Sequence, residues 1–148
     1  MFEYTVTKNN LNDFIKNIDR YKNVFRLLWR AGKLHPILSQ LTNLRELYCD
    51  RNNLTSLEGI ESLVHLQILD CSCNKLRSLK KIKSLIQLKR LDCSFNELKS
   101  LSGIESLIQL RKLNCSNNKL TSLSGIESLV QLQILNCYVN QLTSLEGI

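Results

Sequence analysis

The sequence is poor in several residue types, and each shortage argues against a class of protein. It contains one proline, five glycines and two histidines, and aromatic residues make up only 6%. No apolar run reaches the roughly 18 residues of a membrane-spanning helix, and residues 1–6 lack the basic and apolar segments of a secretory signal. The phosphate-binding motifs G-x-x-x-x-G-K-[ST] and G-x-G-x-x-G are also absent. We therefore expect no membrane association and no nucleotide-dependent enzyme.

Aliphatic residues must supply the core, and positive charge is spread along the chain. The 148 residues are 43% hydrophobic, which suffices for one domain with a core, and leucine and isoleucine dominate that share. The formal net charge is +7, and residues 1–43 carry seven Lys or Arg against three acids. Because no dense basic tail is present, the charge alone is a weak indication of a nucleic-acid or membrane partner.

The chain repeats itself every 22 residues. Residues 44–54 show the frame L-x-x-L-x-C-x-x-N-x-L, and further copies begin at Leu66, Leu88, Leu110 and Leu132. Every copy matches all six fixed positions of the frame, so the repeat is not a coincidence of composition.

This frame resembles that of the leucine-rich-repeat family. The second half of each repeat, L-E-G-I-E-S-L at residues 57–63, is similar to the 22-residue class found in internalins and in a regulatory subunit of protein phosphatase 1. The resemblance covers residues 44–148. It implies an α/β solenoid, an arc or horseshoe with a parallel β-sheet on its concave face and short 3₁₀ or irregular convex segments. Similar Cys-bearing repeats occur in large DNA viruses of amoebae, which suggests a viral source.

The alternation of side chains supports this fold independently of the resemblance. Leu47 and Cys49 alternate with Glu46 and Tyr48, which is the period of a half-buried strand. A single 22-residue coil cannot bury its own apolar face, so the coils must stack and bury each other's. We expect parallel strands about 4.8 Å apart, and 3₁₀ turns rather than long helices on the convex side.

Residues 1–43 are less regular and allow two interpretations. Residues 1–11 and 24–34 fit the repeat frame with substitutions. Alternatively, apolar residues from Leu11 to Leu28 share one face of a single helical cap.

In the helical interpretation, Asn10 and Gly32 cap the helix. We favour a combination of the two, in which divergent capping repeats contain an amphipathic helix and cover the apolar end of the first regular coil. The predicted division is therefore a capping unit over 1–43 and five regular repeats over 44–148, the last one incomplete.

The last repeat ends at Glu146-Gly147-Ile148, without a polar cap. We expect Leu135, Leu142 and Leu145 to be partly open at this end. Because natural proteins usually cover an open edge, either the sequence is a fragment or the end pairs with something, such as a second copy in a homodimer.

Two columns of identical residues have a structural interpretation. The cysteine position alternates inward, where a small apolar side chain packs well, and a straight column does not offer the tetrahedron of a zinc site. In the family, the asparagine position forms a ladder whose amides bind loop backbone of adjacent coils. Six cysteines without a signal sequence favour reduced thiols in the cytoplasm, or in the host-cell cytoplasm if the source is viral. The columns are Cys49, Cys71, Cys93, Cys115 and Cys137, and Asn52, Asn74, Asn96, Asn118 and Asn140.

Nothing in the sequence indicates catalysis. His35 stands before Pro36 in a loop, and His65 replaces the glutamine of other copies. Neither histidine is arranged with a nucleophile and an orienting acid. Cys73, two residues after Cys71, is expected near the strand exit and exposed, where a redox role is the alternative to a structural one. We predict no enzyme, no catalytic residues, no metal and no cofactor.

The variable positions of the strands are the candidate binding site. Their side chains point out of the concave face, where the family binds partners. Aromatic residues dominate the energy of interfaces, and charged residues orient a partner. We predict a protein partner, of unspecified identity, that contacts Tyr48, Asp70, Asp92, Asn114, Asn136, Ile68, Arg90, Lys112, Ile134, Phe95 and Tyr138.

One coil differs from the others and carries an alternative function. Residues 75–90 contain seven basic residues and no acid, with L-K-K-I-K-S in place of L-x-G-I-E-S. Such a coil can contact nucleic acid or another anionic surface, although it lacks the aromatic residues that stack on bases. A protein-interaction scaffold is the favoured function. The alternatives are an anion binder that uses this coil and a self-associating structural segment.

Overall fold

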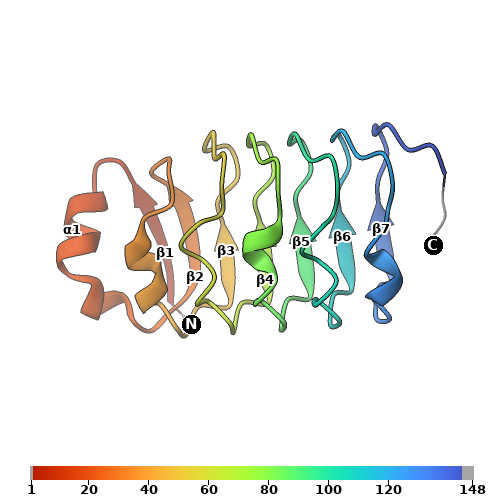
Figure 1. The fold of residues 1–148 in the computed structure, drawn as a ribbon. Coiled ribbons are helices and arrows are strands. Elements are labelled where there is room, and N and C mark those ends of the chain that lie inside the picture. Colours follow the sequence, from red (N-terminus) through yellow and green to blue (C-terminus); the bar gives the residue numbers. More distant parts are fainter. Residues whose placement is uncertain (1, 145–148) are drawn as a thin grey trace.

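The computed structural model describes residues 2–144 and shows an open, seven-stranded parallel sheet (Figure 1). The strands lie in sequence order and point the same way, upward in Figure 1. Each strand is followed by a loop and a return segment, so the chain forms one solenoid of stacked coils. The strands are β1 (Phe2–Thr7), β2 (Val24–Arg30), β3 (Glu46–Tyr48), β4 (Ile68–Asp70), β5 (Arg90–Asp92), β6 (Lys112–Asn114) and β7 (Ile134–Asn136).

The register of the sheet follows the sequence repeat. Leu47 of β3 pairs with Leu69 of β4, and Leu69 pairs with Leu91 of β5. From β3 to β7, every pair joins equivalent positions of successive copies. Equivalent side chains therefore form straight columns along the molecule, which confirms the predicted solenoid.

Short helical segments return the chain on the other side of the sheet. One is α-helical, α1 (Leu11–Lys16), and four are 3₁₀ helices: η1 (Ile18–Tyr21), η2 (Pro36–Gln40), η3 (Lys80–Ile82) and η4 (Ile126–Ser128). The remaining return segments are turns. The prediction of 3₁₀ or irregular convex segments is confirmed.

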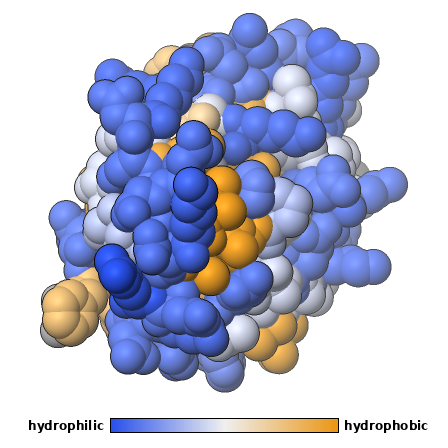
Figure 2. Space-filling model, turned by 90° about the vertical axis from the view of Figure 1, so that its left-hand side faces the viewer, coloured by the Kyte–Doolittle hydropathy of each residue, from blue (hydrophilic) through white to orange (hydrophobic). Residues whose placement is uncertain are grey.

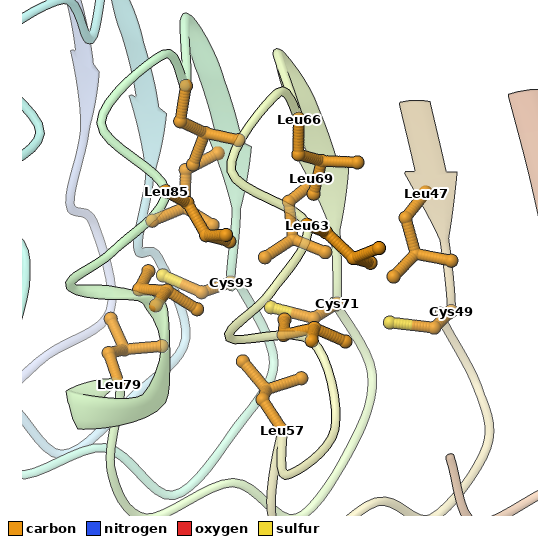
Figure 3. Close-up of a cluster of buried hydrophobic side chains, with 14 of the residues drawn as sticks. Leu47, Cys49, Leu57, Leu63, Leu66, Leu69, Cys71, Leu79, Leu85 and Cys93 are labelled. Carbon is orange, nitrogen blue, oxygen red and sulfur yellow. The ribbon is translucent and has the colours of Figure 1, made fainter. Parts of the chain in front are cut away.

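The core is a stack of aliphatic layers with cysteines interleaved. Leu47, Cys49, Leu69 and Cys71 are fully buried, whereas Tyr48 and its equivalents face outward. Figure 3 shows the leucines of the loop and return segments, such as Leu57 and Leu63, pointing at the same interior. Each coil buries its apolar side chains against the next coil, as the repeat requires.

The first two coils belong to the same sheet, because β1 and β2 pair in parallel with each other and β2 pairs with β3. A single helix through Leu28 is wrong, since α1 ends at Lys16 and Leu28 lies in β2. Asn10 is the N-cap residue of α1, but its side chain accepts a hydrogen bond from the Thr7 amide at 2.7 Å and none from the first turn of the helix. Gly32 has φ +83° in the loop after β2 and its carbonyl accepts a hydrogen bond from the Trp29 indole at 2.9 Å.

Aromatic side chains fill the interior of these first coils. Phe14 of α1 packs 5.8 Å from Tyr4, 4.9 Å from Tyr21 and 6.3 Å from Trp29, measured between ring centroids. Seen from the N-terminal side in Figure 2, the end of the molecule is mostly hydrophilic around a small apolar area. The division into a capping unit and five regular repeats stays a prediction.

At the other end, Leu135 and Leu142 are only partly buried. Leu145 and the final Glu146-Gly147-Ile148 lie outside the described residues. No helix within residues 2–144 has both the length and the apolar character needed to cross a membrane.

Candidate interaction surface

Two columns of outward side chains form the face of the sheet that we call the concave face. The first column pairs Glu46, Ile68, Arg90, Lys112 and Ile134 laterally across β3–β7. The second column pairs Tyr48, Asp70, Asp92, Asn114 and Asn136 in the same way. All the strand residues predicted to bind a partner therefore lie on one continuous surface.

The part of this face over β1–β3 is occupied by its own side chains. Arg26 donates a hydrogen bond to the Tyr48 hydroxyl at 3.0 Å, and its guanidinium carbon lies 4.7 Å from the centroid of the Tyr48 ring. The Tyr48 hydroxyl donates to Glu46 at 3.1 Å, and burial, the largest cause, raises the Tyr48 pKa. Arg26 also forms ion pairs with Glu3 at 3.3 Å and Glu46 at 3.2 Å. The sequence-based prediction missed Arg26 and Glu3, although the alignment of residues 1–11 and 24–34 with the repeat frame places both at the position of Glu46.

The two aspartates of the second column accept hydrogen bonds from residues of their own turns. Asp70 Oδ1 accepts hydrogen bonds from the backbone amide and hydroxyl of Ser72, at 3.0 and 2.7 Å. Asp92 Oδ1 binds Ser94 in the same way, at 3.0 and 2.6 Å, and its Oδ2 accepts from Asn114 at 3.0 Å. Both carboxylate oxygens of Asp92 are therefore satisfied within the protein.

The part of the face over β5–β7 differs, because its cations have no internal partner. Arg90 and Lys112 are exposed, and neither forms an ion pair with any carboxylate of residues 2–144. Beside them, the side chain of Ile134 is 50% exposed. A cavity of about 220 Å³ lies here, lined by Arg90, Leu91, Asp92, Lys112, Leu113, Asn114, Ile134 and Asn136.

Exposed aromatic and aliphatic side chains flank this cavity region where the strands end. Phe95, Tyr138 and Val139 are all exposed. Phe95 and Val139 have φ of +53° and +52°, the left-handed conformation that a side chain, especially a branched one, rarely adopts. The whole column has this conformation: Arg51, Cys73, Phe95, Asn117 and Val139. The sharp turn that starts the asparagine ladder therefore turns these side chains outward.

The asparagine ladder is confirmed as a structural feature. Asn96 Nδ2 donates to the carbonyls of Cys71, Cys93 and Ser94, each at 3.1 Å, and its Oδ1 accepts from the Leu76 amide at 2.9 Å. Asn74 and Asn118 make equivalent contacts in their coils. These side chains satisfy backbone groups in the buried turns and are not part of the candidate site.

The cysteine column is also internal from Cys49 to Cys115, whereas Cys137 in the last coil is partly exposed. Cys49, Cys71 and Cys93 are fully buried, and desolvation is the largest cause that raises the pKa of each thiol. Burial likewise raises the pKa of Cys115 to about 12. All six cysteines are free thiols, and Cys73 is partly exposed as expected. Within the described part of the chain, no group of three potential metal ligands comes together.

The basic coil does not form a single surface. Lys81 forms an ion pair with Glu61 at 3.0 Å on the convex side, and Arg77 pairs with Glu97 at 3.1 Å. Arg90, in contrast, lies on the concave face. The seven cations of residues 75–90 are therefore distributed over several faces.

Comparisons with known proteins agree with this architecture. The family model described as Leucine Rich repeats (2 copies) matches residues 42–84, 86–126 and 108–148. No curated protein sequence shows a significant match to the chain.

Similar solved structures include internalins of Listeria monocytogenes. The internalin InlF structure is 21% identical with a TM-score of 0.75, and the match covers 88% of this chain and 46% of that one. The functional domain of InlJ, which includes a cysteine ladder, is 30% identical with a TM-score of 0.63, covering 87% of this chain and 33% of that one. The ectodomain of the Arabidopsis thaliana receptor kinase SOBIR1 is 27% identical with a TM-score of 0.64, covering 75% and 65%. The chain thus spans between a third and two thirds of the length of these structures.

Proposed function

The chain belongs to the leucine-rich-repeat family, and we propose that it is a non-enzymatic module that binds a protein partner on its concave face. Leucine-rich-repeat proteins generally mediate protein–protein interaction. Within the concave face we assign the contact to the part over β5–β7, which we call the C-terminal concave site and define by Arg90, Lys112, Ile134, Phe95 and Tyr138.

One observation carries this proposal: exposed cations without internal partners lie beside exposed apolar side chains. Over β1–β3, Arg26 is paired with Glu3 and Glu46, so its charge is already compensated. Arg90 and Lys112 have no such compensation from the described residues. A partner that brings a carboxylate to these cations and an apolar side chain to Ile134 gains both charge complementarity and apolar burial. We therefore propose a partner segment that is acidic and carries an apolar or aromatic residue.

The other residues predicted to contact the partner have more specific roles in this proposal. Tyr48 and Ile68 lie outside the C-terminal concave site, and Asp70 closes its own turn. Asp92 and Asn114 line the cavity but bind each other, so they shape the site. We further propose a reducing, cytoplasm-like location, on the basis of six free thiols. The viral source stays a prediction.

Affinity capture with matched charge variants tests the proposal. The wild-type chain, the double variant Arg90→Glu/Lys112→Glu and a control, Lys99→Glu/Lys119→Glu, are used as baits in the same cell lysate, after circular dichroism has shown equal folding. Both variants change the net charge equally, but the control lies on the loop edge. We expect a protein that wild type and control capture equally and that the Arg90/Lys112 variant captures at least tenfold less. Equal capture by all three baits would remove the C-terminal concave site from the proposal.

A second candidate, binding of an anionic surface or nucleic acid, is supported by a different set of residues. Arg77, Lys99 and Lys119 line a cavity of about 440 Å³ around the single carboxylate of Glu97, whose pKa is lowered first by Arg77. Phosphate-driven binding weakens steeply with salt. If the chain binds nucleic acid through this cavity, the variant Lys99→Glu/Lys119→Glu should bind a fluorescent oligonucleotide more weakly than wild type. The variant Arg90→Glu/Lys112→Glu should bind it as wild type does. The two double variants thus exchange roles as test and control.

A further inference from the structure

Four exposed aliphatic side chains form a stripe along the edge at which the strands begin. They occupy the same position in four successive coils, with exposed fractions of 42% for Val64, 52% for Ile86, 55% for Ile108 and 80% for Val130. At the first three positions the neighbouring leucines, such as Leu63 and Leu66, are fully buried, and beside Val130 Leu129 is buried and Leu132 is partly buried. The core is therefore complete without these four side chains, which we call the aliphatic stripe.

The fold does not require an apolar residue at this position. The preceding coil carries Thr42 there, between the buried Leu41 and Leu44, and Thr42 is exposed like the stripe. A monomeric protein rarely exposes a contiguous apolar patch without a use for it. The aliphatic character from Val64 to Val130 is thus a property of the surface and not of the packing.

One side of the stripe is basic. The position three residues after each stripe residue carries Gln67, Lys89, Arg111 and Gln133, whereas the position three residues before it carries Glu61, Lys83, Glu105 and Glu127. Each of these three glutamates accepts a hydrogen bond from a glycine amide of its own turn at 2.7 Å. Lys89 donates to the side chain of Gln67 at 3.2 Å, and neither Lys89 nor Arg111 forms an ion pair with a described residue. A groove of about 340 Å³ runs here, lined by Lys89, Ile108, Gln109, Arg111, Val130 and Gln131.

The spacing of the stripe matches one turn of an α-helix. Beside the stripe, the Lys89 amide donates to the Gln67 carbonyl at 2.8 Å, and the Arg111 amide donates to the Lys89 carbonyl at 2.9 Å. Successive coils are therefore separated here by the same distance as hydrogen-bonded strands. Four coils therefore place their side chains over about 14 Å, at about 4.8 Å per step. An α-helix repeats one face every 5.4 Å or so, which adds up to about 16 Å over three turns. In an extended strand, residues on one face repeat every 6.7 Å or so. Over three such repeats the strand is about 6 Å longer than the stripe, so its side chains lose register with the stripe.

We propose that the aliphatic stripe is a second interface, which binds an amphipathic α-helix of a partner protein. The helix packs apolar residues at positions i, i+4, i+7 and i+11 against the stripe. Acidic residues on its flank face Lys89 and Arg111. Because the stripe lies on another edge of the solenoid than the C-terminal concave site, this inference does not depend on the function proposed above.

A synthetic helix tests the proposal directly. The probe is a 16-residue peptide, stapled into a helix, with Leu at the four apolar positions, Glu on the flank that faces Lys89 and Arg111, and Ala elsewhere. A second probe carries Lys in place of Glu. Methyl-resolved NMR titration of the full chain is expected to shift the signals of Ile86 and Ile108 and leave that of Ile134, on the concave face, unchanged. The acidic probe should bind at least tenfold more tightly than the basic one.

Two sets of variants separate the contributions. Ile86→Thr/Ile108→Thr copies the residue that the chain itself has at position 42 and should weaken binding at least tenfold, whereas Ile134→Thr should not. Lys89→Glu/Arg111→Glu, which leaves the aliphatic residues in place, should reverse the preference between the two probes. Equal binding of both probes, equal binding by the threonine variant, or shifts centred on Ile134 would each overturn the proposal. So would binding of phosphatidylserine vesicles that the threonine variant loses, because the stripe would then contact a membrane.

Discussion

At the scale of the residue, the sequence frame predicts which side chains are internal but not what the variable ones contact. The asparagine and cysteine columns follow from alternation, because every second strand residue must face the core. The contact of Tyr48 with Arg26 does not follow, since the register pairs Arg26 with Glu46 and the contact crosses diagonally from one column to the next. The hydrogen bonds that Ser94 and Asn114 donate to Asp92 depend on turn geometry, which the pattern of residue types does not show.

The asparagine ladder gives a prediction about stability. Asn96→Ala removes a buried side chain that holds four backbone groups, and each buried group left unpaired costs on the order of 1–3 kcal/mol. We expect a loss of about 3 kcal/mol or more in the free energy of unfolding, measured by urea denaturation. Asn140→Ala, at a more exposed rung, serves as the control and should cost clearly less. Equal losses would show that burial does not set the contribution of a rung.

The cysteine column gives a prediction about reactivity. Burial raises the pKa of Cys71 and Cys93, so almost no thiolate forms on these residues near neutral pH, and reagents cannot reach them. With iodoacetamide at pH 8, mass spectrometry of the folded chain should find the partly exposed Cys73 and Cys137 modified first and the four buried thiols modified only after denaturation. Early modification of Cys71 would contradict the packing of the column. The same raised pKa means that the stabilisation from protonated buried thiols is complete below about pH 8.5 and declines as the pH rises above it.

At the scale of the element, the basic coil differs from its neighbours at one position of the backbone turn. Neighbouring coils turn through a glycine with positive φ, such as Gly59 at +99° and Gly103 at +108°. Lys81 occupies this position in the basic coil and lies inside the 3₁₀ helix η3. In the coil of η4 the glycine is kept, since Gly125 has φ +102° and the helix begins directly after it. The helix type was predictable for the convex side as a whole, but the residue at this one position does not determine which coil forms a turn and which a helix.

Gly59 and Gly103 allow a matched comparison. A Cβ at Gly103 would lie 2.8 Å from Leu79 O and from Lys80 Cα, whereas a Cβ at Gly59 has its nearest neighbour at 3.8 Å. Both substitutions incur the strain of positive φ, about 1 kcal/mol, but only Gly103→Ala must also displace backbone of the adjacent coil. We expect Gly103→Ala to lower the free energy of unfolding by about 2 kcal/mol more than Gly59→Ala does, measured by denaturant titration. Equal effects would mean that η3 moves aside freely.

At the scale of the whole molecule, the 22-residue period alone predicts a solenoid with a parallel sheet. Each coil contacts only its neighbours, so a local pattern is enough to specify the global architecture. The candidate site could be predicted as a face, because the outward columns follow from the register. The restriction of the site to β5–β7 could not be predicted from the sequence, since this restriction depends on which charged side chains of neighbouring coils form ion pairs.

Site-specific photo-crosslinking tests directly whether a partner binds at the C-terminal concave site. Ile134 and Ile68 occupy the same column of the concave face, one over β7 and the other over β4. Each is replaced in turn by a benzophenone amino acid, and the chain is irradiated in the lysate that yields the captured protein. We expect an adduct of that protein from position 134 and little or none from position 68. An adduct from position 68 alone, or none from either position, would contradict this proposal.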